Sequence, residues 1–375
     1  MDYITALRSR DRQFIHKLVF CDKDGITIQA IDAKEINGSI SIQYKNGIRR
    51  TCNLILDNST GIFTPSYDGL VSITNTLKLY TGLIVDGVEM YNQRGFFHFG
   101  NPRMTKNKSG QKTIELEMYD SFALLDNTIS GILDYQYIMP AASSIYAAVV
   151  AAFVDSGLET PIIIESTAAV TTIPVSIAQG GTYADIFLTY ANMLGWECFF
   201  DQYNTFRFQS PINQSVQGEI WEFSAIDSWE TTYMSGIHNY EWNKVKNYIL
   251  FVGDNINDVT LIASAQNNNI FSDTYIGKIG KRVSVVEDQA TNTQQVAQNR
   301  VDYELQIQSN IQETADIECV PIDIINENDI VLLNDPENGF NRDRYIINTI
   351  NYPLKNGGNM QCNLIKCTEA VAIGS

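Results

Sequence analysis

The sequence predicts a mainly β protein that carries an α+β insert, and three observations support this fold class. Short β-like runs separated by turn residues fill the first third of the chain and return in the last third. Helical apolar patterns are concentrated between residues 129 and 212, with one more before the final strands. At 375 residues, the chain is also longer than one domain usually is, so we expect several units.

Composition and charge exclude several classes of protein. The chain is 44% hydrophobic and 11% aromatic, so it can bury large faces and is not disordered. With 26 Lys and Arg against 43 Asp and Glu, its net charge of −17 argues against a protein that grips nucleic acid through phosphates. The start lacks a secretory signal, and the longest apolar run, residues 145–154, is about half of a membrane-spanning length. We therefore expect a soluble chain without membrane insertion.

The histidines and cysteines indicate neither a metal site nor a cofactor. His16, His98 and His238 are isolated, and there is no nucleophile elbow, phosphate-binding loop or dinucleotide-binding glycine motif. The six cysteines are too sparse for a disulfide scaffold or a zinc site, so we expect small core or surface residues in a reducing compartment. They are Cys21, Cys52, Cys198, Cys319, Cys362 and Cys367. We predict no catalytic residue, no metal and no cofactor.

The first third of the chain is predicted to be all β. Turn signals at 22–25, 37–38 and 46–47 separate β-forming runs at the spacing expected of a sandwich or barrel. The predicted strands are 14–20, 26–31, 39–44, 52–56, 77–79, 83–85, 96–99 and 113–118.

The middle of the chain, residues 129–212, is predicted to be a small α+β unit. Ser144 and Gly157 bracket an apolar helix, and Thr182 caps a second helix over 183–194 with Asp185 at the capping-box position. The predicted strands are 161–165 and 173–177, followed by a hairpin of 196–201 and 205–209.

The last third is predicted to be mainly β, entered through one helix. Strands at 219–223, 240–242 and 248–252 precede a polar stretch, 254–269, which we expect to be a long surface excursion. Asp288 is predicted to cap a helix whose stripe is Ala290, Thr293, Ala297, Val301 and Leu305. The closing strands are 315–320, 330–333, 345–350 and 360–367.

Two hairpins, at 96–118 and 345–366, echo one another. Each consists of a strand, an Asn-Pro break, a Lys/Asn/Gly turn and a second strand. Any two hairpins with glycine turns look alike, so a chance likeness stays open. If the echo is real, the chain carries two copies of one β-barrel, with the framework residues Phe97, Asn101, Gly110, Asp120, Asp329, Tyr345, Pro353 and Gly358.

Neighbouring Trp and Glu residues raise the alternative of a sugar site. A glycosidase needs two carboxylates beside the sugar, often near aromatic platforms. Neighbours on a strand point to opposite faces, so an inward Trp and an outward Glu on an ordinary amphipathic strand explain the same pattern. The alternative site, catalytic or sugar-binding, consists of Trp229, Glu230, Glu241 and Trp242, with Glu222 beside Trp221 as a further candidate.

The order of the weaker motifs resembles a known family. The motifs are Tyr119-Asp120-Ser121-Phe122, Gly180-Gly181-Thr182-Tyr183, residues 194–201, Phe206-Arg207-Phe208, Pro321, Asn328-Asp329-Ile330-Val331-Leu332 and Tyr345-Ile346-Ile347. This order resembles the baseplate hub family of bacteriophage tails, also called the late control gene D family, and the hub-like N-terminal part of tail-associated lysins. The likeness spans nearly the whole chain and rests on the order and spacing of its motifs.

The resemblance implies a domain plan. It implies two homologous antiparallel β-barrels per chain, so that a homotrimeric ring presents six similar barrels and joins a sixfold tail tube to a threefold spike or fibre. The first barrel would be 1–128, and an α+β domain, 129–212, would follow it. The second barrel would combine 213–253 and 301–375, with an insertion at 254–300 that ends in a helix.

The resemblance also implies partners and a location. A tail tube or distal tail protein would lie above the ring, and a spike, fibre or tail-tip protein below it. A tape-measure protein would occupy the lumen and DNA would pass without specific binding. The location would be the virion tail, assembled in the cytoplasm of a host bacterium. Because the chain ends at Ser375 without an appended domain, we expect any peptidoglycan hydrolase or spike to be a separate polypeptide. A tail-associated cell-wall glycosidase and a carbohydrate- or receptor-binding tail protein remain the alternatives.

Overall fold

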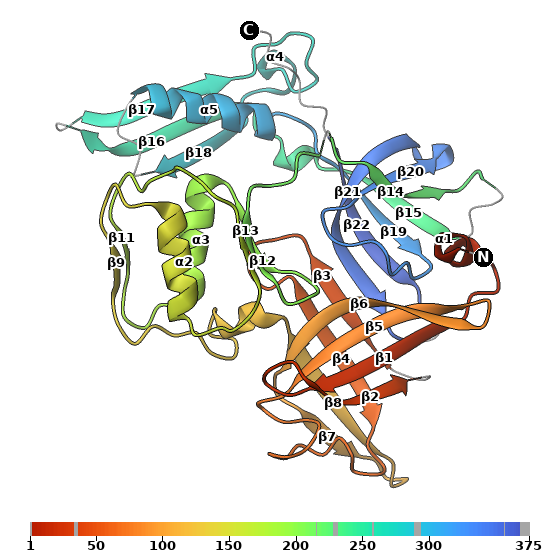
Figure 1. The fold of residues 1–375 in the computed structure, drawn as a ribbon. Helices are drawn as coiled ribbons and strands as arrows, with labels where there is room; N and C mark the ends of the chain where they lie inside the picture. The colour runs from red at the N-terminus through yellow and green to blue at the C-terminus, as the bar shows by residue number, and fades with distance from the viewer. Residues whose placement is uncertain are drawn as a thin grey trace. The chain divides into compact units, whose positions relative to one another are not determined.

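The chain folds into two compact units, which are described separately. Unit 1 comprises Met1–Ile237 and Asp316–Ser375, and unit 2 comprises His238–Ala315. The computed structural model describes residues 2–33, 37–214, 216–227, 232–256, 259–288, 294–355 and 357–367. Strands dominate and helices are few (Figure 1). The predicted fold class, mainly β with an α+β insert, is confirmed.

The first third of unit 1 is all β apart from one short N-terminal helix. This helix, α1 (Tyr3–Arg8), begins where the Asp2 carboxylate accepts a hydrogen bond from the Thr5 N–H at 2.8 Å. Every run predicted here coincides with a strand, apart from the terminal residues Ile26 and Tyr44. The strands are β1 (Phe14–Cys21), β2 (Thr27–Ala33), β3 (Asn37–Gln43), β4 (Arg50–Asp57), β5 (Thr76–Val85), β6 (Val88–Phe99), β7 (Arg103–Lys106) and β8 (Lys112–Tyr119).

The runs predicted separately at 77–79 and 83–85 form one strand, β5, because Gly82 does not interrupt it. β5 pairs with β6 along its whole length, and the two join at Asp86-Gly87, where both residues have positive φ angles of 50° and 80°. A Cβ atom at Gly82 would lie 1.8 Å from the carbonyl oxygen of Met90. Gly82 therefore allows the backbones of β5 and β6 to approach closely, which is a different role from a break.

Replacing Gly82 should therefore destabilise unit 1. We expect Gly82→Ala to lower the free energy of unfolding by about 3 kcal/mol, since backbone on the partner strand must move to admit the methyl group. Urea unfolding followed by circular dichroism measures the change. Gly218→Ala is the matched control, because a Cβ at Gly218 meets nothing within 4 Å. Equal stability of the two variants would contradict the close approach.

Strands from both ends of the sequence share one 14-stranded sheet in unit 1. The order along it is β15-β19-β22-β21-β3-β4-β8-β6-β5-β1-β2, and β14, β20 and β7 branch from this path. The strands added by the last third are β14 (Glu219–Ser224), β15 (Tyr233–Tyr240), β19 (Glu313–Cys319), β20 (Ile330–Asp335), β21 (Phe340–Pro353) and β22 (Met360–Lys366). The link is the antiparallel pair of β3 with β21, in which Ile42 lies opposite Ile350.

The insert between these groups of strands is α+β, as predicted. Its elements are β9 (Tyr137–Met139), α2 (Ile145–Asp155), β10 (Ile162–Ile164), β11 (Val175–Ile177), α3 (Tyr183–Leu194), β12 (Glu197–Phe200) and β13 (Phe206–Gln209). Ser144 caps α2, and Thr182 and Asp185 form the predicted capping box of α3. The two helices pack against each other and against β12 and β13, around Phe153, Phe187 and Phe206 (Figure 1).

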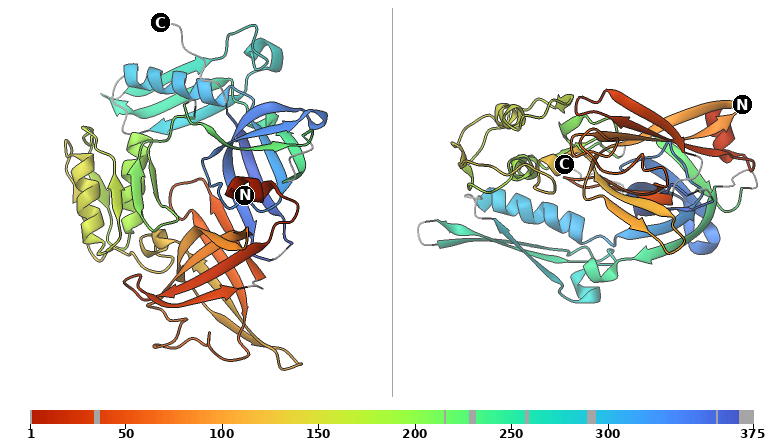
Figure 2. Two further views of the ribbon diagram at one scale, coloured as in Figure 1. Left: turned by 45° about the vertical axis from the view of Figure 1, so that its right-hand side comes forward. Right: turned by 90° about the horizontal axis from the view of Figure 1, so that it is seen from below.

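Unit 2 is a three-stranded sheet with a helix along one face. The strand order is β17-β16-β18. Ala297 and Val301 of the long helix are fully buried in a cluster with Ile249, Phe251 and Ala263 of the strands. Figure 2 shows this helix running along the sheet. The elements are β16 (Tyr248–Ile256), β17 (Val259–Gln266), α4 (Ile276–Ile279), β18 (Val283–Asp288) and α5 (Gln294–Gln308).

Three local predictions were wrong in unit 2. The polar stretch 254–269 contains the whole of β17, because Leu261, Ala263 and Ala265 alternate with polar residues and join the core. Asp288 does not cap a helix, since it is the last residue of β18 and pairs with β16. The strand predicted at 240–242 ends at Tyr240, and a 3₁₀ turn over Trp242–Lys244 follows. Positions 290 and 293 of the predicted stripe lie outside the described residues.

The predicted hairpin echo has one difference between its two halves. Residues 101–102 interrupt the first copy between β6 and β7, whereas Asn351-Tyr352-Pro353 lies inside β21, so the second copy has no break. Both copies pair antiparallel with the strand that follows, β8 or β22. The duplication of a barrel and the domain boundaries stay predictions.

The six cysteines are free thiols, and all except Cys367 are buried. This confirms their predicted role as small core or surface residues. Among the described residues, no helix is long and apolar enough to cross a membrane.

Burial of His16 makes stability sensitive to acid. This side chain of β1 is 4% exposed, and desolvation lowers its pKa to about 4, against 6.5 in the unfolded chain. The folded state therefore binds fewer protons than the unfolded state between these values. The contribution of the buried, neutral His16 to stability is complete above pH 6.5 and is lost as the pH falls toward 4. We expect wild type to lose up to about 3 kcal/mol more than His16→Gln between pH 7 and pH 4. Urea unfolding at pH 7 and pH 4 measures the loss for each protein, and equal losses in wild type and His16→Gln would contradict this.

Candidate functional site

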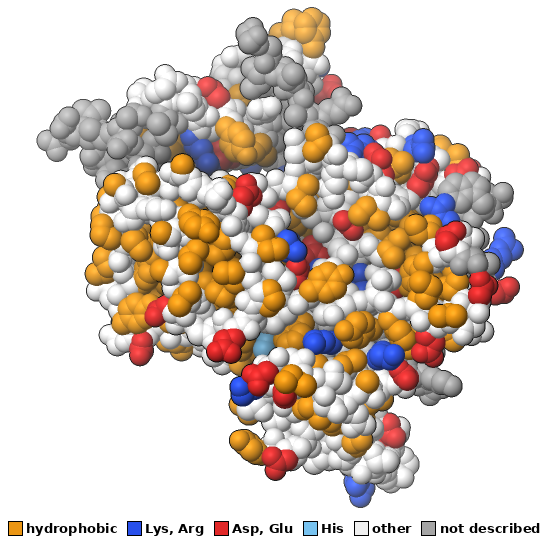
Figure 3. All heavy atoms as spheres, in the orientation of Figure 1, with side chains coloured by type: hydrophobic (Ala, Val, Ile, Leu, Met, Phe, Trp, Pro, Cys, Tyr) orange, Lys and Arg blue, Asp and Glu red, His pale blue; other side chains and the backbone are white. Residues whose placement is uncertain are grey.

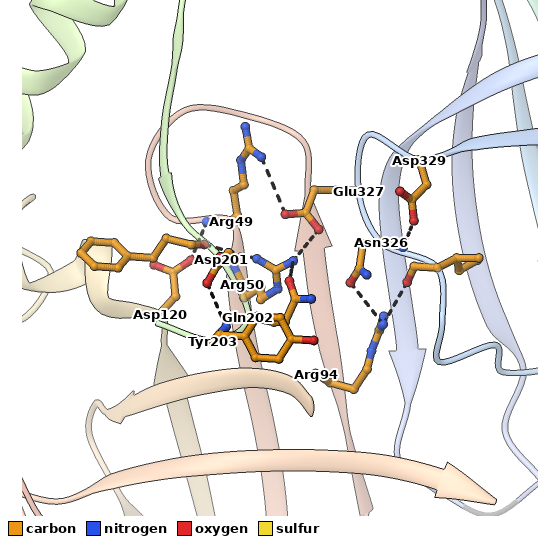
Figure 4. Close-up of polar contacts among 12 residues, drawn as sticks. Arg49, Arg50, Arg94, Asp120, Asp201, Gln202, Tyr203, Asn326, Glu327 and Asp329 are labelled. Atoms are coloured by element: carbon orange, nitrogen blue, oxygen red, sulfur yellow. Dashed lines mark hydrogen bonds and ion pairs between the residues drawn. The ribbon is translucent and has the colours of Figure 1, made fainter. Parts of the chain in front are cut away.

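A group of buried charged side chains joins three regions of unit 1 that are distant in the sequence (Figure 4). Arg50 begins β4 and Arg49 directly precedes it. Glu197 begins β12 of the insert, and Glu327 precedes β20. Each member of the group is 7% exposed or less. We call the group the arginine junction, and its members are Arg49, Arg50, Arg94, Asp120, Glu197 and Glu327.

Two arginines at the start of β4 bind carboxylates from different regions. Arg50 Nη2 lies 2.6 Å from Glu327 Oε2, and Arg49 Nη2 lies 3.2 Å from Glu197 Oε2. Arg49 Nη1 is also 3.8 Å from Glu327 Oε1, so Glu327 faces both arginines. Arg50 donates a further hydrogen bond, of 3.3 Å, to the carbonyl oxygen of Phe200. These pairs connect β4 with both the insert and the last third of the chain.

Asp120 holds the backbone of these two arginines in place. Its Oδ2 accepts hydrogen bonds from the N–H groups of Arg49 and Arg50, both at 2.8 Å. Its Oδ1 accepts the N–H of Phe122 at 3.0 Å and so caps a 3₁₀ turn over Ser121–Leu124. Burial raises the pKa of Asp120 to about 6, against the opposing effect of the three N–H donors. Asp120 is thus the point that connects the end of β8 to the start of β4.

The turn between β3 and β4 packs against β12 of the insert through hydrogen bonds to the backbone of β12. The Gly47 N–H donates to the Cys198 carbonyl at 3.0 Å, and the Cys198 N–H donates to Asn46 Oδ1 at 2.9 Å. Tyr44 Oη donates to the Glu197 carboxylate at 2.5 Å, and burial raises the pKa of this tyrosine. The Arg49 guanidinium stacks on the Phe199 ring at 3.3 Å. The predicted Asn46-Gly47 turn signal therefore marks a docking element.

Arg94 of β6 is a second connection to the segment before β20. It is 1% exposed, and its Nη1 donates to the carbonyl oxygens of Asp323 and Ile325 at 2.9 Å and to Asn326 Oδ1 at 3.2 Å. Desolvation by burial lowers the pKa of this guanidinium and raises that of Asp323. The Asp323 carboxylate accepts hydrogen bonds from Tyr3 Oη and from Asn92 Nδ2. The loop 323–327 is therefore held by α1, β6 and β4 together.

The chemistry of the junction is that of a structural connection. A cavity of about 380 Å³ adjoins it and is lined by both basic and acidic side chains. Two of them, Asp201 and Arg207, form an ion pair of 2.7 Å. Burial raises the pKa of Asp329, which also lines the cavity, to about 6. Among the described residues, no group of His, Cys, Asp and Glu is arranged to hold a metal ion. The arginines and carboxylates neutralise one another, so the arrangement fixes parts of the fold in position.

The eight predicted framework residues do not form one site. Phe97 and Tyr345 are buried in β6 and β21, and Asp120 belongs to the arginine junction. Asp329 accepts the Asn326 N–H at 2.7 Å and lies just before β20. Asn101 and Gly110 are exposed in the loops around β7, Gly358 is half-buried in the β21–β22 turn, and Pro353 ends β21. Their shared role in two copies of a barrel stays a prediction.

The residues of the alternative sugar site are only partly described. Trp229 and Glu230 lie outside the described residues. Glu222 pairs with Arg342 in unit 1, at 2.9 Å, and its neighbour Trp221 is 2% exposed, which confirms the inward Trp and outward Glu. In unit 2, Glu241 pairs with Lys244, while Trp242 is 63% exposed.

The arginine junction was missed by the sequence analysis. The nearest local signal is the pair Arg49-Arg50, two cations directly after a predicted turn in a chain with only 26 Lys and Arg. Their partners Glu197 and Glu327 are 148 and 277 positions from the arginines they contact. No spacing rule connects such distant positions, so the sequence gives no direct indication of the pairing.

Comparison with known proteins supports the predicted resemblance. No protein-family model and no curated protein match the sequence. A tail protein from Neisseria meningitidis MC58 has a similar structure, with a TM-score of 0.65 and 11% identity over 94% of this chain and 97% of that chain. The 43 kDa tail protein of prophage MuSo2 from Shewanella oneidensis has a TM-score of 0.60 and 12% identity over 94% and 98%. The chain therefore shares the fold of these two tail proteins.

A chain of the PdpA–VgrG complex of Francisella has a similar fold as well. Its TM-score is 0.57, with 8% identity over 96% of this chain and 59% of that chain. The whole fold of this chain is thus also found as part of a longer protein.

Proposed function

We propose that the chain is a structural hub of a bacteriophage or phage-like tail. In this proposal three copies form a ring of six similar barrels, which joins the tail tube or a distal tail protein to a spike, fibre or other tail-tip protein. The observation that carries the proposal is the likeness to two tail proteins over 94% of this chain and at least 97% of theirs. A likeness over full lengths concerns the architecture as a whole, which is what a structural part of a tail contributes.

The arginine junction supports this role physically. A hub must hold its parts in fixed relation while it bears contacts above and below. The junction and the β3–β21 pair connect the first third, the insert and the last third within unit 1. The Francisella chain of similar fold belongs to a complex of different proteins, and we propose that this chain also works within an assembly. A tape-measure protein in the lumen is part of the same proposal.

The charge suits a channel through which DNA passes. Three copies carry three times −17, about −51, so carboxylates that face the lumen would repel phosphates and keep DNA from binding as it passes. Carboxylates confined to the outer rim in an image of the ring would contradict this part of the proposal.

The hub is proposed to act without catalysis. Glu222 and Glu241 are each held by a basic side chain, which is typical of surface ion pairs rather than of a glycosidase acid. Glu222→Gln and Glu241→Gln, compared with wild type in a cell-wall hydrolysis assay, test this. We expect no activity in any of the three. Wild-type hydrolysis that either variant abolishes would favour the tail-associated glycosidase.

A carbohydrate- or receptor-binding role is the second candidate, favoured by exposed aromatic rings in unit 2. The Tyr240 and Trp242 rings lie 6.5 Å apart and are 51% and 63% exposed. Such rings can stack on sugars. Glycan-array binding by wild type that Trp242→Ala abolishes would support this role, and no wild-type binding would remove it.

The hub itself is tested by the mass and shape of the purified protein. Native mass spectrometry is expected to show three copies, and negative-stain images are expected to show a ring with six lobes and a central hole. Monomers under all conditions of salt and concentration would overturn the proposal.

A further inference from the structure

Helix α2 of the insert is apolar on both of its faces. One face packs into the core of the insert through Ile145, Ala148, Val149, Ala152 and Phe153. The opposite face, which we call the α2 outer face, consists of Tyr146, Ala147, Val150, Ala151 and Val154. Val154 is 72% exposed and Tyr146 is 39% exposed. A helix on the surface of a protein usually carries charged residues on its outer side, whereas α2 has the composition of a helix that is covered on both sides.

The two helices beside this face carry few charged side chains, and both of those are exposed. Asp155 and Asp185 are the only charged residues of α2 and α3. Asp155 accepts hydrogen bonds from Tyr135 and Tyr183, and Asp185 takes part in the capping box of Thr182. Figure 3 shows hydrophobic side chains gathered over the part of the surface formed by α2 and α3. This surface has the character of an interface.

We infer that the α2 outer face is one of the contacts between one copy of the chain and the next copy in the ring. The inference rests on the proposed trimer. Each copy carries a net charge of −17, so two copies repel each other except where a surface lacks charge, and the α2 outer face meets that condition. Ala147 and Ala151 lie one turn apart and allow another backbone to approach closely, while Tyr146 and Val154 provide apolar area beside them.

The ring geometry decides what this face meets. Contacts between neighbours in a threefold ring are heterologous, so the α2 outer face of one copy lies against a different surface of the next. A lipid surface fits the face less well. The helix carries no Lys or Arg to bind anionic headgroups, and an acidic chain is repelled by them.

A charge placed on this face tests the inference. Val154→Glu should weaken association at least tenfold in sedimentation velocity, with an unchanged circular dichroism spectrum, because the side chain is exposed in one copy and buried in the ring. Val88→Glu is the matched control, since Val88 is also exposed, at 62%, on the β5–β6 hairpin, and it should associate like wild type. A wild-type ring that Val154→Glu leaves intact would overturn the interface and leave the hub standing. A wild type that stays monomeric would overturn the hub, and the interface with it.

Photocrosslinking gives a readout that does not depend on how the Glu variant folds. With p-benzoylphenylalanine at position 154 of the otherwise wild-type chain, irradiation should give covalent dimers and trimers, and mass spectrometry of the cross-linked peptides identifies the surface of the next copy. Cross-links confined to one chain, formed while the ring is intact, would mean that the face is covered from within the same copy and would overturn the inference.

Discussion

Arg50→Ala is expected to destabilise unit 1 by about 3–5 kcal/mol, because it leaves a buried carboxylate without its closest cation. Arg50 is 1% exposed, and its guanidinium lies 2.6 Å from Glu327. After the substitution, Arg49 is the remaining cation near Glu327, at 3.8 Å. The Phe200 carbonyl also loses the hydrogen bond that Arg50 donates to it. Urea unfolding at pH 7, followed by circular dichroism, measures the change.

An exposed pair of the same chemistry is the control. Arg342 and Glu222 make an ion pair of 2.9 Å, but the Arg342 side chain is 62% exposed. Arg342→Ala should therefore destabilise unit 1 far less than Arg50→Ala, because water already solvates an exposed ion pair. If Arg50→Ala and Arg342→Ala lowered the free energy of unfolding equally, burial would not explain the contribution of the junction to stability. The double substitution Arg50→Met with Glu327→Met removes both charges and fills the space with apolar side chains. It leaves no unpaired buried carboxylate at position 327, so it should recover much of the loss.

The sequence predicts the elements of this fold well where the signal is local. The capping box of α3 is an example, since Thr182 and Asp185 are three residues apart and satisfy each other's backbone without help from the rest of the chain. The same holds for the hairpin of β12 and β13, whose turn places Asn204 at a φ angle of 68°. Such features require only neighbouring residues, so they are visible in the sequence.

Errors arose where distant partners decide the structure. Asp288 has the right residue type to cap a helix, yet β16 pairs with its segment in parallel and draws it into a strand. Low charge and scattered apolar residues predict a surface excursion for the β17 segment, and only the packing of α5 shows that its apolar residues face a core. Gly82 could be assigned to a break or to a close approach, and the position of Met90 on the partner strand decides between them.

The candidate site follows the same division. Asp120 was singled out from its place after a predicted strand, and the structure puts it in the arginine junction. The arginines it holds were not singled out, because their partners Glu197 and Glu327 come from other regions of the chain. A buried charge network can be found in a sequence only after the fold that assembles it is known. A local motif can therefore identify the anchor of the junction and still miss the contacts that the anchor supports.

Asp120→Ala is expected to lower the stability of unit 1 by about 3–5 kcal/mol, since it leaves three backbone N–H groups in or beside the core without an acceptor. These groups belong to Arg49, Arg50 and Phe122. Asp120→Asn keeps one acceptor oxygen and should show a smaller loss in thermal and urea unfolding. Asp126→Ala is the control, because Asp126 accepts a single N–H, from Thr128, at an exposed position, and it should cost no more than about 1 kcal/mol. Because Asp120 positions both arginines through their backbone, a double-mutant cycle with Arg50→Ala should be strongly non-additive. Additive losses would mean that Asp120 and the ion pairs stabilise unit 1 independently, contrary to the geometry of the junction.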